Sequence, residues 1–531
     1  MVIYLTTRQQ QFLLKFVLTG VSFLIALALP AFSQAKIRFS PTLTLQEDWS
    51  DNIDQAPDGE EEASFITSVS PAISLSDKTA NSDYRLNYLY QYHHYSNSGF
   101  DDRDENTLNA ALNHFQFDRS LRFFVNGGIF NSRVQPGVFS DGITGTEQVE
   151  TRTAAAGIQY DSGLRAWHTT SFGTEYRKTM TDDDLADTGV HSVEFSTGNG
   201  RKTQKLNWRL GGTGSYDSEK NEHHSIQGHV GIQVAGNYSI FTLGQYSYTA
   251  PDGDNTRNFE FSSWGAGIRR DTPKSSFGVS LNKEETGGDE KFVGVDFSWS
   301  PSVRTTLSGA YSHRFFGKSY EFQLSHKTRR MTNTISYRDS VTSFSQQSAS
   351  SGLGFLVCPA GNSYNQADCF VPTDPGAPLE DNQQLVGVNT PFLKISENQV
   401  LVRSLSHLTR YTKSKTTLTL STHWNRTKSL SSGSIDDKNY DRDFGGIASW
   451  GWKIGSRTEF QMSGGWNKFE KDINLASEES VKEVFSRLNL TRQFSPKVTT
   501  SLSYTFTKHE SSIAENSFNE NRAGVSATAR F

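Results

Sequence analysis

The residues that could do redox or metal chemistry are few, and the cysteines lie close together. The chain holds two of them, Cys358 and Cys369, inside one long polar connection over residues 344–397. If the chain is exported, an oxidising environment favours a disulfide between them. Closing so short a loop would contribute ~3 kcal/mol against local disorder. A metal site or a catalytic thiol is the alternative, but no adjacent histidine pair completes a site.

Histidine pairs and acidic clusters are the other candidates for chemistry. The pairs at 93–94 and 223–224 would point to opposite faces of an extended segment, which is a poor geometry for one metal ion. Carboxylates gather at 60–62, 101–105 and 182–184, where they could share divalent cations with lipopolysaccharide phosphates or be solvated loop tips. The sequence lacks the GxxxxGKS/T, HExxH, CxxC and GxSxG motifs. We therefore expect no catalytic, cofactor-binding or metal-ligating residue, no cofactor and no enzyme activity.

The composition limits the fold classes that could position such residues. The chain has 531 residues, of which 35% are hydrophobic and 12% aromatic, with 43 glycines. It is too polar for large globular cores and too aromatic for a disordered chain. The 52 basic and 57 acidic residues leave a net charge of -5, so we expect no nucleic-acid partner.

Residues 1–35 have the features of a cleaved secretory signal peptide. Arg8 and Lys15 supply positive charge, an apolar run covers 16–29, and small residues surround the cleavage point after Ala35. A membrane anchor is the alternative, but the apolar run is shorter than the ~18–20 residues of a spanning helix. The mature chain would then cover 36–531.

Period-2 alternation runs through the mature chain. In 522–531, every second residue from Ala523 to Phe531 is apolar and the residues between them are polar or small. The same pattern occurs in 84–92, 206–210, 226–234 and 498–506. Because successive strand side chains point to opposite faces, each strand would have one apolar and one polar face.

The connections between these segments alternate between short turns and longer polar loops. This alternation is typical of a transmembrane barrel, in which lipid forces the sheet to close on itself. The prediction is therefore an all-β protein: a single large antiparallel transmembrane barrel of about 24 strands, within a range of about 20 to 26. Both termini would lie in the periplasm. A secreted β-helix or multi-sandwich protein is the alternative. Pro41 and Pro71 should cause bulges or breaks.

A barrel this wide needs an obstruction, since an open lumen would leak metabolites. The largest candidate is the connection 344–397, which could fold into the pore or form an external flap. Arg85, Arg209 and Arg403 are expected to face the lumen and to tune its selectivity.

The sequence also resembles a known family. The segments FSPTLTLQEDWSDNI (39–53), SFITSVSPAISL (64–75), YRLNYLYQYHHY (84–95) and YSHRFFGKSYEFQLSHKTRRMTNTISYRDSV (311–341) are similar to outer-membrane proteins associated with PEP-CTERM/exosortase systems. Phe531 resembles the terminal aromatic by which outer-membrane barrels are recognised for assembly. The resemblance implies an outer-membrane barrel of a Gram-negative bacterium, linked to exopolysaccharide or surface-protein export. It supplies no catalytic residues.

Three functions remain open at this point. The first is an outer-membrane pore or export component for exopolysaccharide or PEP-CTERM surface proteins. The second is a structural or adhesive surface barrel, and the third is a barrel hydrolase. Expected partners are outer-membrane lipid and lipopolysaccharide, the barrel assembly machinery and periplasmic polysaccharide-export proteins.

Overall fold

The computed structural model describes most of the chain from residue 37 onward. The described residues are 37–97, 99–133, 148–163, 167–181, 187–200, 205–218, 220–250, 258–286, 290–342, 355–359, 383–387, 400–429, 440–473 and 479–531. The signal peptide predicted over 1–35 lies outside them and stays a prediction.

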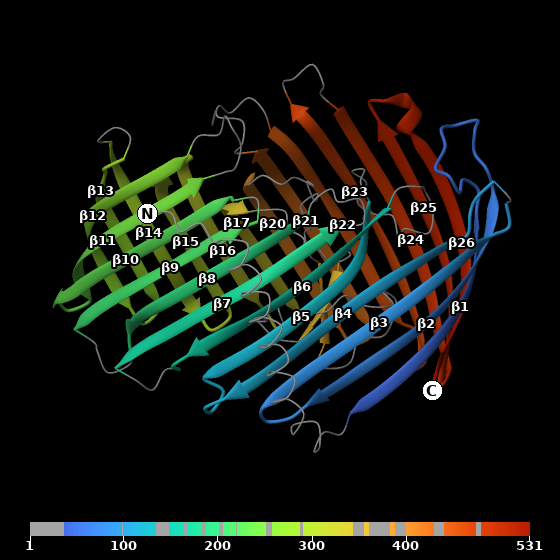
Figure 1. Ribbon diagram of the computed structural model, residues 1–531, viewed down its shortest axis with the longest axis horizontal. Helices are drawn as coiled ribbons and strands as arrows, with labels where there is room; N and C mark the ends of the chain where they lie inside the picture. The colour runs from blue at the N-terminus through green and yellow to red at the C-terminus, as the bar shows by residue number, and fades with distance from the viewer. Residues whose placement is uncertain are drawn as a thin grey trace, which may run out of the picture.

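Twenty-four antiparallel strands form one sheet that closes on itself (Figure 1). The first half of the sheet contains β1 (Arg38–Ser50), β2 (Ser64–Lys78), β3 (Ser82–Tyr95), β4 (Arg103–Gln116), β5 (Leu121–Arg133), β6 (Gln148–Asp161), β7 (His168–Thr181), β8 (Thr188–Asn199), β9 (Leu206–Asp217), β10 (Glu222–Ala235), β11 (Tyr238–Ala250) and β12 (Phe259–Thr272). The second half contains β13 (Ser275–Glu284), β14 (Lys291–Ser302), β15 (Thr305–Arg314), β16 (Gly317–Lys327), β17 (Met331–Thr342), β20 (Val400–Lys413), β21 (Thr416–Ser429), β22 (Tyr440–Lys453), β23 (Thr458–Ile473), β24 (Glu479–Ser495), β25 (Val498–Ser511) and β26 (Phe518–Arg530).

The barrel closes where its first and last strands meet. β1 pairs with β26 from Thr42 opposite Arg530 to Ser50 opposite Arg522. The hydroxyls of Thr44 and Thr528 lie 2.9 Å apart across this pair. In Figure 1 the blue and red ends of the chain lie side by side at this seam. The predicted fold class, with 24 strands, is therefore confirmed.

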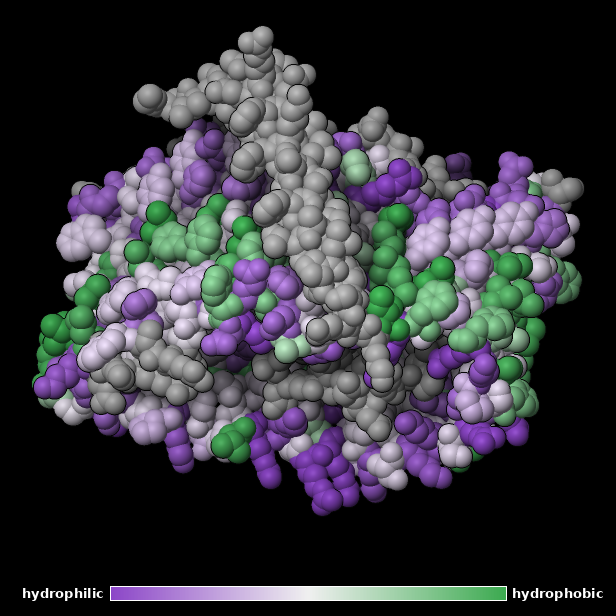
Figure 2. Space-filling view, turned by 60° about the horizontal axis from the view of Figure 1, so that its bottom comes forward, coloured by the Kyte–Doolittle hydropathy of each residue, from purple (hydrophilic) through white to green (hydrophobic). Residues whose placement is uncertain are grey.

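The strands alternate between an apolar outer face and an inner face that is polar over most of its area. On β12, Phe261 and Ser263 are buried, whereas Trp264 and Ile268 are 58% and 62% exposed. Trp264 and Ile268 are apolar, and apolar side chains are the ones that can face the hydrocarbon of a membrane. We therefore assign their face of β12 to the outside of the barrel. Figure 2 shows hydrophobic residues concentrated across the middle of the molecule and hydrophilic residues along its upper and lower edges. This belt is what a transmembrane barrel requires.

The two ends of the barrel differ. One end, here called the turn end, carries the beginning of β1, the end of β26 and short turns such as 236–237 and 273–274. The other, the loop end, carries longer connections such as 51–63 and 251–258. The predicted alternation of short and long connections is not strict, because the loop-end connection 218–221 is shorter than the turn-end connections 162–167 and 200–205. The clearest exception is the β15–β16 hairpin. The two-residue turn Phe315–Phe316 joins β15 and β16 at the loop end, and β13 and β15 are the shortest barrel strands, with 10 residues each.

The predicted break occurs at Pro71, whereas neither proline causes a bulge in the β1–β2 pairing. β1 and β2 stay in register through both of them, with Pro41 opposite Ile73 and Leu43 opposite Pro71. Pro71 interrupts the ladder to β3 without a register shift, because pairing stops at Val69 and resumes at Ala72. Since proline lacks an N–H, the ladder to β3 loses bonds at this point without a shift in register.

Three further elements complete the described chain, and one of them is the short 3-10 helix η2 (Ala514–Asn516) between β25 and β26. β18 (Phe355–Pro359) and β19 (Gln383–Gly387) form a separate two-stranded sheet within the long connection. The rest of 344–397 lies outside the described residues, so its predicted role in the pore stays a prediction. Among the residues that the structure covers, no helix is long and apolar enough to cross a membrane.

Candidate pore constriction

The tip of the β15–β16 hairpin leaves the barrel wall. β15 pairs with β14 only as far as Tyr311, opposite Val295, and β16 pairs with β17 only from Glu321 onward. Residues 312–319 therefore pair with each other but not with the neighbouring wall strands. At this point the Asp339 carboxylate takes the place of a strand partner, because its Oδ2 accepts the Tyr320 N–H at 2.9 Å.

The tip instead packs against inner-face residues of strands farther along the wall. The side-chain amide of Gln245 on β11 donates to the carbonyl oxygen of His313 at 2.9 Å. Gln245 lies on the same face as Phe241, which is 3% exposed, whereas Ile240 on the opposite face is 52% exposed. This bond therefore forms inside the barrel.

Aromatic contacts hold the rest of the tip. The ring of Phe315 stacks on Phe259 of β12 with centroids 5.3 Å apart. Phe316, 6% exposed, belongs to one buried cluster with Phe259 and with Leu401, which begins β20. Five wall strands separate β12 from β20, so the tip joins parts of the wall that are not neighbours.

The His313 ring sits among lumen-side aromatics. It meets Phe292 edge-on at 5.4 Å between centroids and lies 6.1 Å from Phe261. Gly294 shares the Phe292 face and lies against Ser280 and Asn282, both buried inner-face residues. The hairpin tip, residues 312–319, therefore bends into the barrel and narrows its lumen at the loop end.

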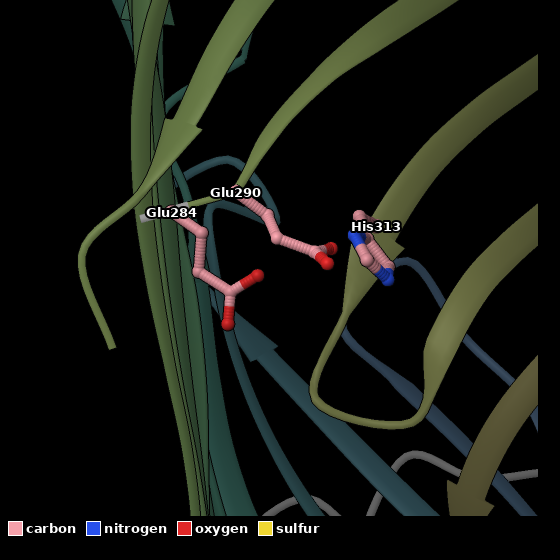
Figure 3. A group of neighbouring side chains, drawn as sticks. All are labelled: Glu284, Glu290 and His313. Atoms are coloured by element: carbon pink, nitrogen blue, oxygen red, sulfur yellow. The ribbon is translucent and has the colours of Figure 1, made fainter. Parts of the chain in front are cut away.

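Two carboxylates face His313 across the base of the tip. Figure 3 shows Glu284 at the end of β13 and Glu290 before β14, with Glu290 pointing toward the imidazole. One ligand atom from each of the three residues lies within 4.8 Å of the others. Carboxylate oxygens with one imidazole are donors that divalent cations accept. Within the described residues neither glutamate has an ion pair with lysine or arginine, so negative charge collects at this entrance.

Sequence reasoning missed both the tip and these three residues. Nothing in a period-2 pattern distinguishes a hairpin that stays in the wall from one that folds inward. Glu284 and His313 are far apart in the chain, and only the strand register brings them together. The adjacent Phe315 and Phe316 in a tight turn were the available signal that this hairpin folds inward, because a loop tip exposed to solvent is normally polar.

A second inward element is the β1–β2 loop, residues 51–63. Ile53 is 2% exposed and packs in a buried cluster with Ile66, Tyr95 and Phe100. Ile66 shares the inner face of β2 with the buried Ser68, because Phe65 on the other face is 54% exposed.

Hydrogen bonds attach this loop to β26. The Asn52 amide, fully buried, donates to the carbonyls of Ala56 at 2.8 Å and Asn519 at 3.0 Å. The Asp51 carboxylate accepts the backbone and side-chain N–H groups of Asn521 at 2.7 and 2.8 Å. Gln55 donates to Glu520 at 3.3 Å. This loop is therefore joined to the strand beside it, across the seam.

The histidine pairs point to opposite faces, as the sequence predicted. His93 is 1% exposed on the inner face, where its Nδ1 lies 2.7 Å from the Ser68 hydroxyl, whereas His94 binds Asp102. His93 is therefore a buried inner-face residue rather than a solvent-facing one. A serine and a histidine at this distance are the first two parts of a nucleophilic site. Both are buried, and His93 Nε2 has no hydrogen-bond partner among the residues that the structure describes, so these residues supply no third part for the pair.

The expected pore-lining arginines divide between the two faces. Arg85 shares the inner face of β3 with His93, and Arg209 lies opposite His229 on the inner face. The prediction for Arg403 is wrong. It shares the face of Leu405, which is 40% exposed, and its Nε lies 3.9 Å from Asp339. The alternation along β20 places Arg403 on the outer face, and a shift of one residue in phase is enough to reverse the face of a strand side chain.

The remaining predicted residues have separate outcomes. Phe531 follows β26 at the turn end, 70% exposed, and its backbone N–H donates to the Pro41 carbonyl at 3.1 Å. Its role as an assembly signal stays a prediction. Cys358 lies on β18 and Cys369 lies outside the described residues, so the disulfide also stays a prediction.

Comparison with known proteins gives structural neighbours only. No family model matches the chain, and no curated protein does. Similar solved structures include the siderophore receptor PirA from Acinetobacter baumannii, at 8% identity and a TM-score of 0.41, covering 93% of this chain and 81% of that one. The FrpB iron transporter from Neisseria meningitidis matches at 10% identity and a TM-score of 0.41, with the same coverage of 93% and 81%. OccK2 (OpdF) from Pseudomonas aeruginosa matches at 10% identity and a TM-score of 0.32, covering 93% of this chain and 98% of that one. Likenesses this distant carry no argument about function.

Proposed function

We propose that the chain is an outer-membrane pore or export channel whose lumen is narrowed by the hairpin tip, residues 312–319. The observation that carries this proposal is the attachment of the tip to the inner faces of β11 and β12, through Gln245 and Phe259. A barrel of 24 strands without an internal element would be wide enough to pass metabolites. An inward element that joins distant parts of the wall reduces that bore.

The outer-membrane location is part of the proposal. It is supported by the closed sheet and its apolar outer belt, since a closed barrel is how strands cross a bilayer. We place the turn end, with both ends of the sheet, in the periplasm and the loop end outside. The finer role, export of exopolysaccharide or PEP-CTERM surface proteins, rests on the sequence resemblance alone.

Removing the tip tests the proposal directly. Tyr311 and Tyr320 are directly opposite each other, so an Asn-Gly turn can replace residues 312–319 without disturbing the wall. We expect the single-channel conductance of this variant in planar bilayers to rise several-fold. The matched control replaces Pro273–Lys274, a two-residue turn at the other end, with Asn-Gly and leaves conductance unchanged. If neither the original chain nor the tip variant conducts, the surface-barrel alternative replaces the pore.

A further inference from the structure

We propose that a divalent transition-metal ion such as Zn²⁺ binds between Glu284, Glu290 and His313 and fastens the hairpin tip to the wall. Figure 3 shows these side chains as neighbours that come from the end of β13, the residue before β14 and the tip. One ligand atom of each lies within 4.8 Å of the other two. A tetrahedral Zn²⁺ holds its ligand atoms ~2.0–2.2 Å away and therefore ~3.3 Å from one another, so small rotations of the two glutamates would complete the site.

The two glutamates lie across from each other at the loop end of the β13–β14 pair. Lys283 is opposite Lys291, and the next residues, Glu284 and Glu290, are joined by a backbone hydrogen bond of 2.9 Å. Trp264, an outer-face residue, is opposite Lys283, so both lysines point outward. The glutamates, one position farther along each strand, point inward. The positive charge of the lysines is thus on the other side of the sheet.

No described basic residue compensates this pair of carboxylates. Neither carboxylate has a hydrogen bond or an ion pair within the part of the chain that the structure describes. The charged groups that act on Glu284 there are His313 and Glu290. On the outer face, by contrast, Glu285 lies 3.4 Å from the Lys283 ammonium group. A cation between Glu284 and Glu290 would offset their repulsion, and the imidazole would supply its third ligand.

A buried hydroxyl beside the cluster gives independent support for a metal site. Ser263 on β12 is 4% exposed, and it lies directly opposite Glu284 on the inner face. Its Oγ has no hydrogen-bond partner among the described residues, although buried hydroxyls normally have one. Opposite residues have Cβ atoms ~4.5–5.5 Å apart, so this hydroxyl can donate to a metal-bound Glu284 carboxylate. Such hydrogen bonds orient metal ligands and raise the affinity for the metal.

The donor set favours a transition-metal ion over Ca²⁺ or Mg²⁺. Imidazole nitrogen is a common ligand of zinc, copper, iron and nickel, whereas Ca²⁺ and Mg²⁺ prefer oxygen. The His313 ring is held in place by Phe261 and Phe292, with centroids 6.1 and 5.4 Å away. Three protein ligands leave a fourth position for water. Since Glu290 is exposed, an ion can enter from the loop end.

The cluster forms only because the tip bends inward. β14 pairs with β15 as far as Val295 and Tyr311. Continuing this register would place His313 beside Val293, whose side chain is 43% exposed on the outer face. The bend instead brings the imidazole to inner-face residues. An ion that binds only this arrangement stabilises it, so it would hold the tip in the lumen. This effect on the tip rests on the proposed pore function, whereas binding of the ion does not.

The first test measures metal binding to the untagged, detergent-purified full chain. Both cysteines are alkylated so that thiols do not compete, and Zn²⁺, Ca²⁺ and Mg²⁺ are titrated by isothermal calorimetry. We expect Zn²⁺ to bind most tightly. In E290Q and in H313F the affinity for Zn²⁺ should fall at least about tenfold, since even residues that only orient metal ligands contribute about 10- to 100-fold. H313F keeps an aromatic ring at this position.

Two further variants sharpen this measurement. S263A should lower the affinity for Zn²⁺ about tenfold, because it removes the hydroxyl that orients Glu284. The matched control is E285Q, which changes a glutamate of the same loop. Glu285 binds Trp264 and Lys283 on the outer face, so this variant should leave the affinity unchanged.

The second test follows the position of the tip. The variant Q245A lacks the hydrogen bond to the His313 carbonyl and should open briefly. At a free Zn²⁺ concentration of about ten times Kd, its open fraction should fall about tenfold, and a chelator should restore it. Q245A/E290Q should not respond to Zn²⁺. The ion selectivity of this entrance is measured with chelator present, so that the charge of the glutamates is tested without the metal.

Three outcomes would overturn the inference. Unchanged Zn²⁺ affinity in both E290Q and H313F would place the ion elsewhere. Binding of Ca²⁺ as tight as that of Zn²⁺ would remove the imidazole from the ligand set. Intact binding with no effect on the openings of Q245A would separate the ion from the tip.

The two tests remain decisive if a variant misfolds or if the barrel does not conduct. Misfolding is seen as loss of heat-modifiable gel mobility, and the comparison of the three ions on the original chain needs no variant. Metal binding is measured without conductance, so a failed metal site and a failed pore are distinguishable.

Discussion

Two elements fold inward from the loop end, and they are held in opposite ways. The hairpin tip, residues 312–319, is held mainly by the rings of Phe315 and Phe316 and crosses to strands that are not its neighbours. The β1–β2 loop, residues 51–63, is held mainly by Asn52 and Asp51, which bind the adjacent strand β26. Aromatic packing is non-directional and tolerates sliding, whereas hydrogen bonds fix one geometry.

The contrast assigns different roles to the two elements. The loop closes the seam of the sheet, where a fixed geometry protects the pairing of β1 with β26. The tip lies across the lumen, where a contact surface made mainly of aromatic packing permits displacement. The following changes test this contrast, from the largest expected effect to the smallest.

The variant F316A should have the largest effect. Phe316 is 6% exposed between Phe259 and Leu401, and truncating a buried phenylalanine costs about 3–5 kcal/mol. We expect the tip to detach and the conductance to approach that of the tip-deleted chain. The control is F494A at the turn end, where Phe494 is 56% exposed and no change is expected. Unchanged conductance in F316A would mean that the tip does not obstruct the pore.

The variant N52A should loosen the β1–β2 loop at the seam without affecting the hairpin tip. It leaves the N–H of Ala56 and the carbonyl of Asn519 without their buried partner, at a cost of about 1–3 kcal/mol. Limited proteolysis within the loop should become roughly 5- to 150-fold faster, while conductance stays the same. A rise in conductance would contradict the separation of roles.

The variant Q245A removes a directional bond that holds the tip. Loss of a single amide-to-carbonyl hydrogen bond costs about 0.5–1.5 kcal/mol. We expect brief openings to a higher conductance level in single-channel records. The control Q461A changes another glutamine in the opposite wall and should leave the records as they were.

The double variant E284Q/E290Q should have the smallest effect. It removes two negative charges beside His313 without changing the size of the side chains. We expect a lower preference for cations, seen as a shift in reversal potential across a salt gradient and fading above about 1 M salt. E459Q, near the turn end, is the control. An unchanged reversal potential would mean that permeating ions do not pass this entrance.

The sequence predicted the wall better than the lumen. Alternation such as that from Ala523 to Phe531 is a local property, and repeating it around a closed sheet leads to the observed strand count. The tip is not local, because its position depends on Phe259 and Leu401, which lie in other strands. The face that Arg403 occupies could not be predicted for a similar reason. It depends on the residue at which β20 begins, and a long connection precedes that strand.

The pairing of β1 with β26 also constrains the order of assembly. Thr44 and Thr528, whose hydroxyls meet across the seam, are separated by 484 positions in the chain. Until β26 is in place, β1 presents an open row of N–H and C=O groups, which is a template for pairing with other chains. A cell that makes this protein must therefore protect the unpaired edge of β1 during synthesis and transport. The edge is paired only when β26, the last strand of the chain, is in place.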